Sequence, residues 1–107
     1  MIRESSLFTE WAEELEGNDL LRSESAIEKI LSLGVVTSSK NLGAGLYEKK
    51  WKSGLRFYFS VILSGDDRST LLLLGSLKGR LQERAIAECR RQLRFLNVFN
   101  GDIKKRD

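Results

Sequence analysis

The feature that most limits the possible folds is a series of three strand-like runs within residues 46–74, joined by very short connections. In the middle run, Leu55–Leu63, large apolar residues occupy every second position, which is the period of a β-strand. A two-residue turn at residues 53–54 precedes this run and a turn at 65–67 follows it. Connections this short exclude parallel crossovers, so the runs are predicted to form an antiparallel meander. Residues 35–45 are predicted to be an extended connection that ends in a Gly-Ala-Gly turn.

Helical patterns lie on both sides of the meander. A serine N-cap at residues 5–6 precedes apolar residues at helical spacing, among them Phe8 and Trp11, which we predict to pack in the core. A second helix is predicted over residues 19–33, followed by a glycine at the position that favours a helix end. The last helix is predicted from Arg80 to about Phe95. This order of elements is typical of the α+β class.

A chain of 107 residues is long enough for one domain and too short for two. We predict a single domain over residues 1–96, with two N-terminal helices, an antiparallel sheet of three to four strands and a C-terminal helix. The basic tail, residues 97–107, is predicted to be flexible. The sequence shows no secretory signal and no run long enough to span a membrane, which predicts a soluble cytoplasmic protein.

Histidine is absent from the sequence, and Cys89 is its single cysteine. The absence of histidine excludes Ser-His-Asp and Cys-His nucleophile pairs, an imidazole base and zinc sites of the Cys/His type. A single cysteine excludes an internal disulfide and fits a reducing compartment. Cys89 falls on the apolar stripe of the last helix, so we predict a small buried hydrophobe rather than a reactive thiol. We also predict no metal ion and no cofactor.

Charge is divided unevenly along the chain. Residues 1–34 carry eight acids and three bases, whereas residues 35–107 carry seven acids and fifteen bases; the whole chain has a net charge of +3. Such asymmetry favours a protein whose basic part meets a polyanion while its acidic part is solvated or faces a basic partner. The alternative is two ordinary solvated surfaces that differ in charge.

Cations and a phenol gather on the polar face of the predicted sheet. Arg56 and Tyr58 lie on the face of their strand that points away from the core, and the neighbouring strand projects lysines from the same surface. Cations bind the phosphates of RNA and aromatic rings stack on its bases. The alternative is a solvated face kept soluble by its lysines. The predicted surface consists of Lys50, Lys52, Arg56, Tyr58, Lys78 and Arg80.

This surface has the residue types that RNA cleavage needs. RNA carries its own nucleophile, the 2′-hydroxyl, so a cleaving protein supplies a base, an acid and stabilisation of the phosphorane dianion. Arg56 suits the last role because its guanidinium is permanently charged and has a planar fork of donors. Without histidine, the base is a lysine crowded by other cations, a carboxylate such as Glu48, or a group on a partner. Lys50 is admissible as base or acid.

Four pieces of the sequence resemble, in order and spacing, the RelE/HigB-type toxins of type II toxin–antitoxin modules. Within this RelE/ParE superfamily, the resemblance is closest to the addiction module killer proteins. It extends over about residues 2–94 and implies a compact α+β, ribonuclease-like fold. It also implies ribosome-dependent cleavage of mRNA in the A site and neutralisation by a cognate antitoxin. The four pieces are Phe8–Trp11, Tyr47–Lys50, Gly54–Phe59 and Gly75–Gln82.

The resemblance also implies roles for individual residues. Arg56 matches the strand arginine of the family, Lys50 its basic strand residue, and Lys78 the lysine before the last helix. These three are the predicted catalytic residues. The predicted partners are a cognate antitoxin and mRNA on the ribosome. A ParE-like inhibitor of DNA gyrase and a non-catalytic, degenerate binding module remain alternatives. The predicted RNA contacts are Lys52, Tyr58, Arg80 and Arg84.

Overall fold

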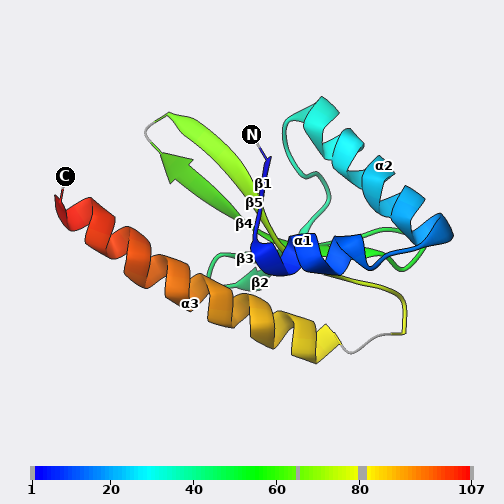
Figure 1. The fold of residues 1–107 in the computed structure, drawn as a ribbon. Helices are drawn as coiled ribbons and strands as arrows, with labels where there is room; N and C mark the ends of the chain where they lie inside the picture. Colours follow the sequence, from blue (N-terminus) through cyan, green and yellow to red (C-terminus); the bar gives the residue numbers. More distant parts are fainter. Residues whose placement is uncertain (1, 65, 80–81, 107) are drawn as a thin grey trace.

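A computed structural model of the chain describes residues 2–64, 66–79 and 82–106 (Figure 1). Five strands form one sheet in the order β1-β5-β4-β3-β2. Helices α1 and α2 pack on one face of this sheet and α3 packs on the other. The elements are β1 (Ile2–Glu4), α1 (Ser6–Glu13), α2 (Gly17–Leu33), β2 (Lys40–Gly43), β3 (Leu46–Lys50), β4 (Arg56–Ser64), β5 (Asp67–Ser76) and α3 (Gln82–Arg106).

The sheet confirms the antiparallel meander and extends it. Strands β3, β4 and β5 pair antiparallel in chain order, as the short connections predict, and β2 adds antiparallel to β3. The three-residue strand β1 pairs in parallel with β5 at the edge, so the sheet has five strands and is mixed. The three predicted runs are β3, β4 and β5. Strand β2 lies in residues 35–45, which were predicted to be an extended connection, and β1 is too brief to give a periodic pattern.

The start of α1 and the end of α2 are those that the sequence predicts. The Ser5 hydroxyl accepts a hydrogen bond of 3.2 Å from the Phe8 backbone N–H and donates one of 2.8 Å to the Leu73 carbonyl. It therefore caps α1 and ties the helix to β5. Helix α2 ends at Gly34, whose N–H donates to the Ile30 carbonyl at 2.8 Å.

Aromatic rings fill the space between the sheet and the two N-terminal helices. Phe57 on β4 makes edge contacts with Phe8, Trp11 and Trp51, with ring centroids 4.9–6.2 Å apart. Phe8 and Phe57 are completely buried. Trp11 lies flat against Gly75 of β5, where any side chain would collide with the indole. The predicted core positions of Phe8 and Trp11 are confirmed.

Helix α3 covers the opposite face of the sheet with small apolar side chains. Ala85 and Cys89 pack on Leu46, Tyr58 and Leu73, and Cys89 is completely buried, as predicted. This burial raises the pKa of the Cys89 thiol to about 12, so the thiol stays protonated.

Two local predictions differ from the structure. The connection between β3 and β4 is longer than a two-residue turn: the N–H of Trp51 donates to the Leu55 carbonyl at 2.9 Å and encloses three residues. Gly54 in this turn has a φ of 93°, and a side chain there would collide with Lys78. Helix α3 continues to Arg106, well past its predicted end near Phe95. The flexibility of residues 97–107 stays a prediction. No helix in the described residues is long and apolar enough to cross a membrane.

Candidate functional site

Strand pairing places charged residues from three strands on one face of the sheet. Lys50 on β3 lies opposite Arg56 on β4, and Glu48 lies opposite Tyr58. On the other side of β3, Lys40 of β2 lies opposite Glu48. Directly opposite residues project to the same side of a sheet, and so do residues two apart on one strand. The register therefore gathers three cations and one carboxylate at one end of the face that α3 covers.

These side chains border a polar hollow of about 400 Å³. It lies at the first turn of α3, because Gln82 is the first residue of that helix and lines the hollow. The hollow has a basic character, with three cations and one acid among its lining residues. They are Ser38, Lys40, Glu48, Lys50, Arg56 and Gln82.

Arg56 is the most enclosed of the cations at the hollow, with only 8% of its surface exposed. Its guanidinium donates to the Gly54 carbonyl at 3.5 Å. The amide of Gln82 fits its surroundings with the oxygen toward Arg56, which places that oxygen 2.5–3.0 Å from the three guanidinium nitrogens. Among the described residues, no carboxylate lies within ion-pair distance of Arg56. The guanidinium is thus in contact with neutral groups and forms no direct ion pair in the described part of the chain.

Tyr58 occupies a different environment from the one that the sequence predicts. Its side chain is completely buried under α3, and its hydroxyl shares a hydrogen bond of 3.3 Å with the Ser76 hydroxyl. Burial raises the pKa of Tyr58 above its ordinary value, the Ser76 hydrogen bond lowers it, and the Glu48 charge raises it. The expectation of an exposed phenol that stacks on a base is therefore corrected. Period-2 alternation shows which residues share a face, but not that a helix covers that face.

The other predicted basic residues do not line this hollow. Lys78 packs against Gly54 of the β3–β4 turn and lines a second hollow together with Asp19 and Arg22. Arg84 lines a third hollow, on the side of Trp11. Lys52 is exposed in the β3–β4 turn, and Arg80 lies outside the described residues.

The single predicted surface is therefore divided. Of the three predicted catalytic residues, the hollow brings together Lys50 and Arg56, whereas Lys78 lines the second hollow. The division follows from the end of β5 at Ser76, after which the chain turns past Gly54 instead of continuing along the sheet.

Sequence reasoning missed Lys40, Ser38 and Gln82 as lining residues. The first two lie in the segment predicted to be an extended connection, and only the pairing of β2 with β3 places Lys40 beside Glu48. Gln82 closes the last of the four motif pieces, so its position in the motif was the available signal. No cluster of three or more metal-binding side chains occurs in the described part of the chain.

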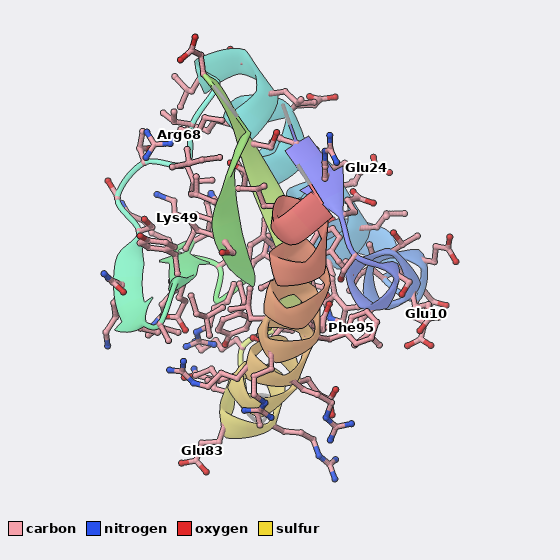
Figure 2. All side chains as sticks on the ribbon, turned by 90° about the vertical axis from the view of Figure 1, so that its left-hand side faces the viewer. Glu10, Glu24, Lys49, Arg68, Glu83 and Phe95 are labelled. Atoms are coloured by element: carbon pink, nitrogen blue, oxygen red, sulfur yellow. The ribbon has the colours of Figure 1, made fainter. Side chains whose placement is uncertain are left out.

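The uneven charge of the sequence becomes a separation in space. Figure 2 shows Glu10 of α1 and Glu24 of α2 on one side of the molecule, and Lys49 and Arg68 on the other. Lys49 itself borders α2 and is not one of the residues that line the basic hollow.

No protein-family model matches the chain, and no curated protein matches it. Two solved structures are similar. The isolated E. coli RelE toxin superposes with a TM-score of 0.58 and 16% identity, covering 84% of this chain and 96% of its own. This chain has a RelE-like fold. The intact E. coli RelBE toxin–antitoxin complex gives a TM-score of 0.57 and 16% identity, covering 75% of this chain and 98% of its own. The RelE-like fold confirms the predicted α+β class.

Proposed function

We propose that the chain is the toxin of a type II toxin–antitoxin module and cleaves mRNA on the ribosome. The observation that carries this proposal is the enclosed guanidinium of Arg56, which forms no direct ion pair among the described residues and lines one hollow with a carboxylate and two lysines. A cation fixed in this way suits the stabilisation of a phosphorane dianion. The RelE-like fold and the four motif pieces support the same assignment.

The proposed reaction uses three side chains. The Glu48 carboxylate accepts the proton of the RNA 2′-hydroxyl, whose oxygen attacks the adjacent phosphorus. Arg56 donates hydrogen bonds to the phosphorane oxygens and balances their additional negative charge. The Lys50 ammonium gives its proton to the departing 5′-oxygen. The products are a 2′,3′-cyclic phosphate and a 5′-hydroxyl, and no water or metal ion takes part.

The remaining cations hold the RNA strand on either side of the scissile phosphate. Lys40 lines the hollow, and the exposed Lys52 lies in the turn that follows β3. Lys78, a predicted catalytic residue, contacts a neighbouring phosphate from its own hollow and enters the reaction only if its side chain swings toward Arg56. Arg84, which lines the third hollow, and Arg80 are further proposed RNA contacts. Each phosphate neutralised in this way increases the salt dependence of binding.

The proposed partner is a cognate antitoxin, in line with the RelBE toxin–antitoxin complex among the similar structures. A toxin that acts on translating ribosomes is placed in the cytoplasm. An antitoxin that covers the basic hollow would block RNA by occupying the same cations, and an acidic segment is the chemistry expected for it.

The test is a translation reaction with purified ribosomes and a defined message. The wild-type protein is expected to cut the message and leave 2′,3′-cyclic phosphate ends. Arg56→Ala is expected to lower the cleavage rate about a hundredfold or more, because it removes the cation at the developing charge. Arg91→Ala is the matched control: this arginine is mostly exposed and pairs with Glu88 at 3.4 Å. It is expected to cleave like the wild type.

Three results would contradict the proposal. If Arg56→Ala loses cooperative thermal unfolding, Arg56 is a structural residue. If the wild-type protein leaves the message intact but stops supercoiling by gyrase, the ParE-like alternative applies. A protein inactive in both assays that still binds its antitoxin tightly is a degenerate binding module.

A further inference from the structure

We propose that Gln82 is a positioning residue that holds Arg56 in place while leaving its positive charge free for a phosphate. This inference rests on the proposed function, because it concerns the same hollow. Its physical basis is the choice of a neutral amide, rather than a carboxylate, as the partner of an enclosed arginine.

The contact between the two side chains is short. With its oxygen turned toward Arg56, the Gln82 amide places that oxygen 2.5 Å from Nη2, 2.9 Å from Nη1 and 3.0 Å from Nε, against the face of the guanidinium. The guanidinium also donates a hydrogen bond to the Gly54 carbonyl at 3.5 Å, which is long and weak. Gln82 is therefore the main polar group that fixes where the guanidinium points.

The position of Gln82 makes this contact rigid. It is the first residue of α3, and three residues later Ala85 is buried against the sheet. The packed helix fixes the backbone from which the amide projects. Arg56 is fixed equally well, because its own backbone pairs with Lys50 on one side and with Ser76 on the other. A small change in Gln82 thus acts directly on the guanidinium.

A glutamate at position 82 would have the same shape and a very different effect. An arginine and a carboxylate at hydrogen-bond distance form a strong, charge-assisted pair, and that pair would neutralise Arg56. An incoming phosphate would then have to break the pair and meet an added negative charge. With glutamine, the enclosed charge finds its counter-ion only when a phosphate enters the hollow. The neutral amide therefore makes the free protein less stable than a carboxylate would, and it leaves the charge of Arg56 available to bind an anion.

Stability and RNA affinity are therefore expected to change in opposite directions when Gln82 is replaced by glutamate. Gln82→Glu is expected to raise the melting temperature and to weaken RNA binding roughly ten- to a hundredfold, the range for loss of a hydrogen-bonded charge contact. Gln82→Ala is expected to lower the melting temperature, because Arg56 loses its partner, and to weaken RNA binding less, because the charge remains. If Gln82 were only a structural link, stability and affinity would rise or fall together.

The experiment measures thermal unfolding and binding with the full chain. The probe is a 2′-O-methyl RNA oligonucleotide, which cannot undergo attack by its own 2′-hydroxyl, and inorganic pyrophosphate is a second anion. Ala87→Glu adds the same charge at an exposed position of the same helix and serves as the control. The expected result is that only Gln82→Glu combines a higher melting temperature with weak binding and a shallower dependence of binding on salt.

Three outcomes overturn the inference. Gln82→Glu binds RNA as tightly as the wild type, or it weakens binding no more than Ala87→Glu does, or neither probe binds the wild type. The proposed cleavage fails in a different way. A wild-type protein that binds the oligonucleotide but leaves messages uncut on the ribosome contradicts the cleavage and leaves the role of Gln82 intact.

Discussion

The two faces of the sheet are built for different purposes. On the face of α1 and α2, Phe57 is enclosed by three aromatic rings, and the packing is mostly apolar. On the face of α3, the packing is apolar only around Tyr58 and Cys89. Toward Arg56 the same face opens into the polar hollow. The first face therefore stabilises the fold, and the second combines a smaller core with the candidate site.

Strand β4 shows how one segment serves both purposes. Its neighbours Arg56 and Phe57 are both buried, yet Phe57 contacts rings and Arg56 contacts a carbonyl and an amide. The difference arises because α3 starts at Gln82, so the face beside Arg56 is only partly covered. Substitutions on the face of α1 and α2 should therefore change the stability of the fold, whereas substitutions at the polar hollow should change activity.

The largest effect on stability is expected from the aromatic face. Phe57→Ala removes a completely buried ring that contacts Phe8, Trp11 and Trp51, and it leaves a cavity. We expect a loss of about 3–5 kcal/mol in the free energy of unfolding, measured by urea titration. Leu63→Ala on the same strand is the control: Leu63 is 69% exposed, and we expect a change of about 0.5 kcal/mol or less. Equal losses in the two variants would refute this account of the core.

A smaller loss is expected from overpacking on the same face. Gly75→Ala would drive a methyl group into the indole of Trp11, and we expect a cost of about 1–3 kcal/mol in urea unfolding. Trp11→Leu alone should also destabilise the fold. The double variant should be more stable than the sum of the two single changes predicts, because the smaller side chain leaves room for the methyl group. Additive losses would show that the ring does not restrict position 75.

Alkaline pH probes the core under α3. The pKa of Cys89 is raised to about 12 in the folded protein, so above about pH 9 the unfolded chain releases this proton while the folded chain keeps it. Stability is therefore full below pH 9 and falls as the pH rises toward 12. We expect a loss of about 1 kcal/mol between pH 8 and pH 10. Cys89→Ala should lose less over that interval, and an unchanged pH dependence would place the thiol in water.

The sequence predicted those parts of the fold that depend on local pattern. Alternation identified β4, the serine cap and Gly34 marked the ends of two helices, and short connections implied antiparallel pairing. The α+β class followed from the order of these elements. The parallel edge strand β1 could not be predicted from the pattern, because three residues show no periodicity. Its pairing with β5 depends on the rest of the fold.

The candidate site was predictable only in part, for reasons of tertiary structure. Lys50 and Arg56 were brought together correctly because they are neighbours across one hairpin. Tyr58 was expected to be exposed because its neighbours on that face are polar, yet α3 covers it. Lys78 was expected beside them, but the chain leaves the sheet after Ser76. Contacts between distant segments decide these positions, and no local pattern reports them.

The smallest effect is expected at Tyr58, which lies between the apolar core under α3 and the polar hollow. Tyr58→Phe keeps the buried ring and removes a hydroxyl whose hydrogen bond to Ser76 is 3.3 Å long, so we expect a loss of about 1 kcal/mol or less. The buried ring does not reach RNA, so message cleavage and RNA affinity should stay within about twofold of wild type, a change of about 0.4 kcal/mol. Ser76→Ala removes the other hydroxyl of the same hydrogen bond and should behave alike.

If Tyr58→Phe keeps its stability but cleaves more than tenfold slower while Ser76→Ala cleaves normally, the phenol itself takes part in the reaction. The face under α3 would then open when RNA binds, and the division between a closed core and an open site would hold only for the free protein.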